Sequence, residues 1–355
     1  MNRSTLSLIL GAVAGAIVLA GVFTGVSLVR PGWLRELLAP GAVTAATPST
    51  PALPTEPGQP GVFSTATPPP PGVTPLPTDA DAACGGPEQI TIALLGVDDR
   101  EGNYGKPTRT DAISLVNVRF TDRTASILSI PRDLYVPLPY LEAAGILQDR
   151  INTAYLHGEV YGVEGGGPAE FKATVELNFG VRVHRYVMVN FGAFVALVDA
   201  LGGIDLEVPK AIYDPMFPAE DGIHYELFEL PAGLQHLDGA TALKYARTRH
   251  QDDDYRRIQR QQAILLAIRD KIARPEVLPQ IPALIQALSG SIRTDLTAEE
   301  LAALACLGPQ IDRAAITTHA ITGAHIIPWT TPSGGRVSIP DRDAIAPLVE
   351  AFLGR

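Results

Sequence analysis

Several residue types that mark common active sites are scarce in this sequence. Its 355 residues include only two cysteines, which form neither a CxxC redox motif nor a zinc-ligand spacing. No GxSxG or HExxH motif occurs, so no nucleophile elbow or zinc-protease helix is expected. Basic residues (28) are fewer than acidic ones (38), and the net charge of −10 argues against a general affinity for nucleic acid or anionic lipid. A local cluster of arginines is therefore informative in this chain.

The two cysteines, Cys84 and Cys306, lie near the two ends of the expected folded region. They would be free in the cytosol and could pair in an oxidising compartment. A bridge requires their Cα atoms to lie within about 7 Å, and it would tie the two ends of the domain together.

Charge is absent from residues 6–29, which are almost all apolar or small. A run longer than about 18 such residues is long enough to cross a bilayer. The alternative is a cleaved signal peptide, but the run is long for one and no AxA site follows closely. We therefore expect an uncleaved membrane anchor over 6–29. Arg3 lies before the run and Arg30 and Arg35 lie after it, so the positive-inside rule does not decide its orientation.

Composition changes again over residues 30–86, which are rich in Pro, Thr, Ala, Gly and Ser. Such a segment buries too little apolar surface to offset its ordering entropy, so we expect a disordered, extended spacer. A globular pattern follows, and we assign residues 87–355 to one domain.

Short apolar runs that end at Gly, Pro or polar residues predict the strands of this domain. Helical patterns alternate with them, over 191–201, 238–246 and 255–272, and Gly202 and Gly203 end the first in the usual way. Strands that alternate with helices predict an α/β domain with a mixed central sheet flanked by helices. The expected strands are 90–97, 112–120, 125–130, 185–190, 204–208 and, near the C-terminus, 326–329.

Polar side chains follow or open two of these strands. Asp98 and Arg100 come directly after 90–97, and Arg109 and Asp111 open 112–120. Ligands of α/β sheets gather at such an edge. Asp98 and Asp111 together could bind Mg²⁺, which takes few carboxylates and completes its shell with water and phosphate oxygens. When each pair is taken alone, an ordinary polar strand-to-loop exit explains Asp98 and Arg100 better, and a surface ion pair explains Arg109 and Asp111 equally well.

A third strand delivers Arg132 and Asp133 to the sheet edge. Pro131 ends the strand and fixes the direction in which the chain leaves it. Arginine suits phosphate because its planar guanidinium donates two parallel hydrogen bonds. Arg or Asp residues now lie at the ends of three strands, which makes coincidence a poor explanation.

The densest cluster begins after the helical pattern 238–246. Arg247 and Arg249 frame an Arg-Thr-Arg sequence, and Arg257 and Gln261 share one face of the next helix. A solvated charged helix is the plain alternative, but it does not account for the repeated arginines before the helix. Phosphoryl transfer requires no protein nucleophile and depends on positioning and charge neutralisation by metal and arginine, which matches this set.

With these clusters in order, the sequence resembles the LytR-CpsA-Psr family of cell-wall glycopolymer transferases over residues 89–272. Each motif alone is weak, and six in the family's order are specific. The segments that carry the resemblance are ALLGVDDR, RTDAISLV, SILSIPRDLYVPLP, INTAY, VNFGAFVALVDALGGIDLEVP and LDGATALKYARTRHQDDDYRRIQRQQ.

The resemblance implies an extracytoplasmic enzyme on a single membrane anchor, with residues 1–5 in the cytoplasm. It implies Mg²⁺-dependent transfer of a polyprenyl-pyrophosphate-linked glycopolymer to peptidoglycan or another envelope glycan, without nucleic acid. The lipid tail would lie in an apolar tunnel between the sheet and its helices. Alternatives are hydrolysis of the polyprenyl pyrophosphate and non-catalytic lipid binding or regulation.

Site roles follow from the resemblance position by position. Asp98 and Asp111 match the metal ligands, and Asp133 would orient Arg132. We expect Arg132, Arg247, Arg249 and Asp133 to be catalytic, and Arg100, Arg109, Arg257 and Gln261 to bind the substrate.

Overall fold

The structure is a computed structural model. It describes residues 76–79, 81–97, 107–219, 223–248, 254–272, 274, 277, 292–331 and 334–355. The N-terminal residues 1–5, the expected anchor 6–29 and most of the expected spacer lie outside these ranges. Within them, no helix combines the length and apolar character needed to cross a membrane.

A mixed six-stranded sheet forms the centre of the described fold, in the order β11-β6-β1-β2-β3-β12. β1 pairs in parallel with β6 and β3 with β12, while the other neighbours are antiparallel. The strands are β1 (Gln89–Val97), β2 (Thr110–Arg119), β3 (Thr124–Ser129), β6 (Arg185–Asn190), β11 (Ile292–Thr294) and β12 (Ile316–Ala320).

Both faces of this sheet are buried, which explains the nearly continuous apolar runs in its strands. Alternate residues of β1 point to opposite faces: Ile90 and Ile92 belong to one apolar core, and Leu95 and Val97 to the other. Two helical layers must therefore cover the sheet.

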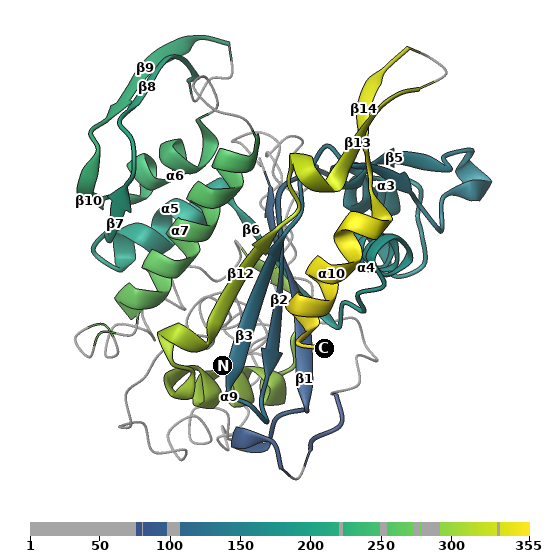
Figure 1. Ribbon diagram of the computed structural model, residues 1–355, viewed down its shortest axis with the longest axis horizontal. Helices are drawn as coiled ribbons and strands as arrows, with labels where there is room; N and C mark the ends of the chain where they lie inside the picture. The colour runs from purple at the N-terminus through teal and green to yellow at the C-terminus, as the bar shows by residue number, and fades with distance from the viewer. Residues whose placement is uncertain are drawn as a thin grey trace, which may run out of the picture.

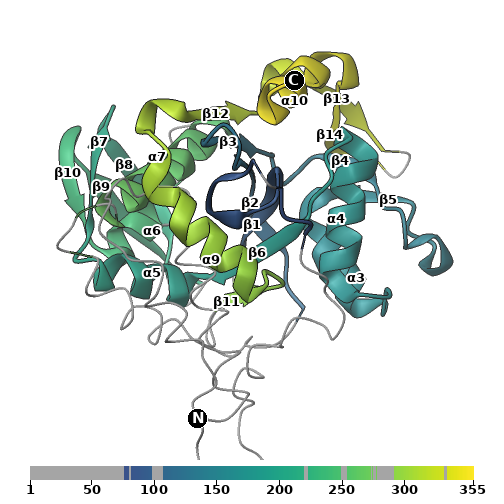
Figure 2. The same cartoon turned by 90° about the horizontal axis from the view of Figure 1, so that it is seen from below.

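Figure 1 shows these layers on either side of the central strands, and Figure 2 shows the same arrangement from below. One layer contains α5 (Phe191–Ala200), α6 (Gly239–Arg247) and α7 (Asp254–Ile272). The other contains α3 (Ala154–Val160), α4 (Gly166–Phe179) and α10 (Arg342–Leu353). The predicted α/β class, with a mixed sheet flanked by helices, is confirmed for the described residues.

Smaller two-stranded sheets surround this centre. The expected strand at 204–208 is present, but it pairs only with β10 and does not join the central sheet. The pairs are β7 (Ile204–Val208) with β10 (Gly233–Leu237), β8 (Ile212–Pro218) with β9 (Tyr225–Leu230), β4 (Tyr135–Pro137) with β5 (Gln148–Arg150), and β13 (Ile326–Thr330) with β14 (Arg336–Pro340).

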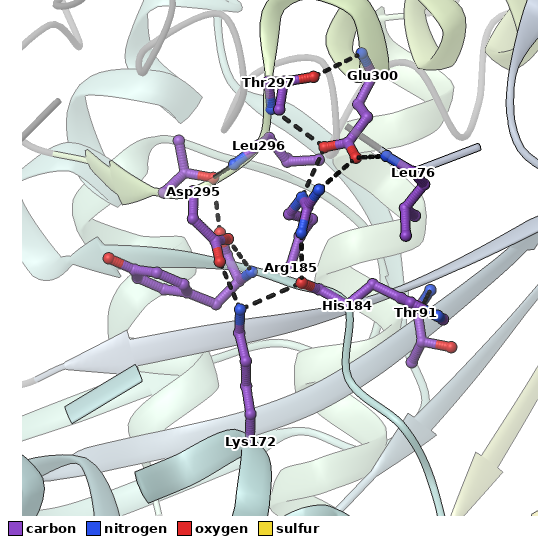
Figure 3. Close-up of polar contacts among 11 residues, drawn as sticks. Leu76, Thr91, Lys172, His184, Arg185, Asp295, Leu296, Thr297 and Glu300 are labelled. Atoms are coloured by element: carbon purple, nitrogen blue, oxygen red, sulfur yellow. Dashed lines mark hydrogen bonds and ion pairs between the residues drawn. The ribbon is translucent and has the colours of Figure 1, made fainter. Parts of the chain in front are cut away.

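A buried polar cluster joins the start of β6 to α9 (Ala298–Leu307), as Figure 3 shows. The Arg185 guanidinium donates two hydrogen bonds of 2.7 Å to the Glu300 carboxylate, and both side chains are almost fully buried. Glu300 also accepts from the backbone amides of Leu76 and Thr297. Beside this pair, Lys172 of α4 forms an ion pair with Asp295. The cluster thus fixes the described N-terminal segment to the sheet.

A disulfide between Cys84 and Cys306 also holds the N-terminal segment, by joining it to α9, with Cα atoms 5.8 Å apart. The pairing that the sequence left open is present. Because Leu76 also packs against the core, the ordered domain begins before Pro87, the boundary that composition suggests. Proline and threonine content alone does not reveal these long-range contacts.

Candidate active site: an apolar cavity with a charged end

A cavity of about 570 Å³ lies between one face of the sheet and the helices α5, α6 and α7. Its sheet wall includes Leu94 of β1 together with Val187 and Val189 of β6. Its helical wall is also mainly apolar and includes Phe194, Leu197, Leu243, Ala246, Ile264, Leu265 and Ile268. An apolar chain is the class of ligand that such walls favour.

Gly96 explains how close the strands are at the edge of this cavity. It lies opposite Ala112, and a Cβ placed on it would come within 3.0 Å of the Ala112 Cβ. The β1–β2 register also shifts between Gly96 and Val97. Both Gly96 and Ala112 line the cavity, so a small residue here keeps this edge open.

Charged side chains, several of which the sequence selected, occupy one part of the cavity wall. Asp111 at the start of β2 and Arg132 after β3 both line it. Arg132 Nη1 donates to Asp111 Oδ1 at 2.6 Å, and Arg132 Nε lies 3.5 Å from Asp133 Oδ2. Asp133 thus contacts Arg132 as expected, although Asp133 itself is not part of the wall. The two carboxylates hold the guanidinium at the end of β3.

Arg247 at the end of α6 reaches the same cavity from the helical side. Its guanidinium carbon lies 4.7 Å from the ring centre of Phe191 and 5.2 Å from that of Phe217. Such stacking favours the cation and restricts its orientation. Arg247 is therefore pre-organised as a charged wall of an otherwise apolar space.

The turn that follows Arg247 is fixed from two directions. Thr248 is buried; its hydroxyl donates to Asp214 Oδ2 at 2.6 Å, and its carbonyl accepts from Arg260 Nη2 at 2.5 Å. Arg260 also stacks on Tyr245. Asp214 is 1% exposed and lines the cavity, although the sequence gave no reason to select it. Asp214 lies on β8 and holds the turn at Thr248, a contact between segments 34 residues apart in the sequence.

The predicted pair on α7 is also in place, since Arg257 and Gln261 both line the cavity. Arg257 is 4% exposed, so it is an interior guanidinium and not part of a solvated helix face. Arg109 differs: it is exposed and does not belong to the cavity wall. It immediately precedes β2, which begins at Thr110.

Three of the predicted site residues lie outside the described ranges, namely Asp98, Arg100 and Arg249. Their roles stay predictions. The described part of the chain contains no group of three or more His, Cys, Asp or Glu residues arranged to hold a metal.

Asp111 and the arginines beside it offer the chemistry that a magnesium–phosphate site needs. Asp111 is a partly exposed carboxylate on the cavity wall, next to a cation-rich surface that suits phosphate oxygens. Mg²⁺ commonly takes only one or two protein carboxylates and fills its remaining positions with water and substrate phosphates. The chemistry of these residues therefore fits this ion, and Asp111 is the described carboxylate that could hold it.

Comparisons with known proteins point to one family. The LytR_cpsA_psr family matches residues 79–341. A polyisoprenyl-teichoic acid–peptidoglycan teichoic acid transferase TagU of Oceanobacillus iheyensis is 32% identical over 219 residues, 61% of this chain and 62% of that protein. The chain covers between 51% and 65% of the length of the first four curated relatives.

Solved structures show the same fold. Bacillus subtilis TagV gives a TM-score of 0.59 at 26% identity, covering 75% of this chain and 98% of that one. A TagT chain bound to LIIa-WTA gives 0.54 at 25% identity, covering 76% and 92%. The family match spans most of this chain and includes every described residue of the charged cavity wall, so the protein belongs to the LytR_cpsA_psr (LytR-CpsA-Psr) family.

Proposed function

We propose that this protein transfers a polyprenyl-pyrophosphate-linked glycopolymer to peptidoglycan or another envelope glycan. The observation that carries the proposal is one continuous cavity with apolar walls and a charged part that holds Asp111, Arg132, Arg247 and Arg257. A polyprenyl tail suits the apolar walls, and a pyrophosphate suits the guanidinium groups. Relatives named as teichoic acid transferases support the same reaction.

The reaction exchanges one phosphorus–oxygen bond for another. An acceptor hydroxyl oxygen bonds to the sugar-linked phosphorus, its proton passes to water, and the bond to the oxygen of the leaving polyprenyl phosphate breaks. Negative charge grows on the leaving phosphate as that bond lengthens. Arg132 and Arg247 are fixed before the substrate arrives, so they stabilise this charge with little reorganisation.

The other residues act by holding these two arginines. Asp111 and Asp133 orient Arg132, and Phe191 and Phe217 orient Arg247. Asp111 would hold Mg²⁺, which when bound neutralises phosphate charge. The expected anchor over 6–29 would keep the domain outside the cell and beside its lipid substrate.

A cavity-filling substitution tests the lipid part of the proposal. Ala246 lines the cavity, so Ala246→Trp should block the tail and abolish the co-purification of polyprenyl lipid, as measured by mass spectrometry of extracts of the full chain. Leu177→Trp is the matched control, because Leu177 is 50% exposed on α4 across the sheet. Equal amounts of polyprenyl lipid in both variants, or none in the wild type, would contradict the proposal.

A further inference from the structure

A strip of exposed side chains leads away from Arg132 on the side of β4 and β5, outside the cavity. Asp133 lies between two guanidinium groups, with Oδ2 3.5 Å from Arg132 Nε and Oδ1 3.9 Å from Arg150 Nε. Their side chains are half exposed, at 51% for Asp133 and 49% for Arg150. The strip therefore begins at the charged wall and continues over an open surface.

An aromatic pair extends this strip. Arg150 lies opposite Tyr135 in the β4–β5 ladder, and the ring of Tyr135 lies 5.8 Å from that of Trp329 on β13, at an interplanar angle of 34°. The β13–β14 hairpin is fixed beside Arg132 and Asp133 because Ser338 pairs with Leu134. Figure 1 shows β13 and β14 near β5, and Figure 2 shows β14 beside β4.

Trp329 is 38% exposed, which is more than anchoring the hairpin requires. A tryptophan that served only as an anchor would bury its large apolar ring. Polar groups that can pair with hydroxyls and amides lie along the same strip, at Asp133 and Arg150. Aromatic rings beside charged, planar hydrogen-bonding groups are the combination that recognises a sugar chain, through the C–H face of the sugar and its polar edge.

We propose that the strip formed by Asp133, Arg150, Tyr135 and Trp329 binds the acceptor glycan. This inference rests on the proposed transfer reaction. The lipid cavity and the strip meet at Arg132, so the donor would approach the reacting phosphate from the cavity and the acceptor from the strip. The acceptor class is a glycan with acidic substituents, such as that of peptidoglycan, which would pair with the exposed guanidinium of Arg150.

Direct binding tests the strip without any turnover. The probe is a fluorescent, peptide-free tetrasaccharide of alternating N-acetylglucosamine and N-acetylmuramic acid, titrated into the full chain in detergent micelles and followed by anisotropy. Trp329→Ala should weaken binding by about tenfold or more, the usual scale for truncating a tryptophan anchor. Trp329→Phe keeps a ring against Tyr135 and should restore most of the affinity.

Ile327→Ala is the matched control, since Ile327 lies on the same strand and is 46% exposed. It should bind the glycan within twofold of wild type. The inference is overturned if Trp329→Ala also stays within twofold, or if Ile327→Ala loses as much affinity as Trp329→Ala does.

Kinetics separate this role from the donor chemistry. Trp329→Ala and Arg150→Ala should raise the KM for the acceptor and leave the KM for the donor lipid unchanged. A parallel rise in both KM values would overturn the strip as an acceptor site. If the wild type binds the tetrasaccharide through Trp329 but transfers nothing, the strip remains a glycan-binding site and the proposed transfer function is contradicted.

Discussion

Arg247 is the best residue for testing how the charged part of the cavity wall stabilises the transition state. Substitutions there can change the geometry of the side chain while its positive charge is kept. Its guanidinium is stacked on Phe191 and Phe217, at 4.7 and 5.2 Å from the ring centres. Removing one pre-organised donor of this kind typically lowers kcat by 10²–10³, or roughly 2.7–4 kcal/mol of transition-state stabilisation. We therefore expect Arg247→Ala to lower the transfer rate by about 10² or more.

Two further variants divide this loss. Arg247→Lys keeps the positive charge but loses the planar guanidinium and its stacking on the two rings, so the transfer rate should fall about tenfold. Phe191→Leu removes one of the two rings. A cation–π contact of about 0.5–1 kcal/mol corresponds to a fall in the transfer rate of roughly two- to fivefold.

The assay is the rate of transfer of a labelled polyprenyl-pyrophosphate oligosaccharide to an acceptor glycan, at saturating donor. Arg256→Ala is the control, since Arg256 is an exposed arginine nearby on α7 and should change the rate by less than twofold. The reasoning is refuted if Arg247→Lys retains the full rate, or if Arg256→Ala is as slow as Arg247→Ala.

Three further predictions concern the metal, the buried ion pair and pH. Asp111→Asn should abolish Mg²⁺-dependent transfer with an unchanged circular dichroism spectrum, because an amide does not offset the cation; undiminished turnover in this variant or in chelator would contradict it. Glu300→Gln leaves the Arg185 cation buried and without its counter-charge, which costs about 3–5 kcal/mol of folding stability. The Tm should therefore fall by roughly 6–20 °C. The control Glu299→Gln changes an exposed residue and should shift the Tm by less than about 2 °C, and equal Tm values for the two variants would refute the stabilising role of the cluster. Burial, followed by the charges of Arg182 and Arg185, lowers the pKa of His184 to about 4, below its usual 6.5. As the pH falls, the unfolded chain binds this proton before the folded one does, so the free energy of unfolding should decline from about pH 6.5 towards pH 4 and level off below. His184→Asn keeps an acceptor for the Thr91 backbone amide and should flatten that decline, as measured by urea unfolding. Identical pH profiles for the variant and the wild type would contradict the assignment.

Individual strands could be predicted from the sequence because their signal is local. An apolar run bounded by Gly, Pro or polar residues gave β6 and β7 with the bounds that the structure shows. Pairing partners are not local, so the sequence did not indicate that β7 leaves the central sheet and pairs with β10.

Helix α4 shows a second limit. It buries Glu170, Thr174 and Asn178, which interrupt the apolar periodicity that predicts a helix. Glu170 accepts hydrogen bonds from the Tyr140 amide and the Thr174 hydroxyl, and burial raises the pKa of its carboxyl. These polar groups are satisfied only once the domain is folded, so the pattern gave no sign of them.

The same distinction applies to the site. Arginine and aspartate at the strand ends were visible as motifs, and Asp111, Arg132, Arg247, Arg257 and Gln261 do line one cavity. What holds them was not visible, because the rings beside Arg247 and the carboxylate beneath Thr248 come from distant segments. Arg109 carries the same residue type in a matching motif and yet lies exposed outside the cavity wall, so a motif alone does not place a side chain.

Release of polyprenyl monophosphate from a labelled polyprenyl-pyrophosphate oligosaccharide tests the central claim most directly. With Mg²⁺ and a peptidoglycan acceptor, the full chain should release one polyprenyl monophosphate for each labelled oligosaccharide attached to the acceptor, and Arg132→Ala should slow both by about 10² or more. Release of the lipid phosphate without attachment would show hydrolysis instead of transfer. Neither product from the wild type, or equal rates in Arg132→Ala, would contradict the account.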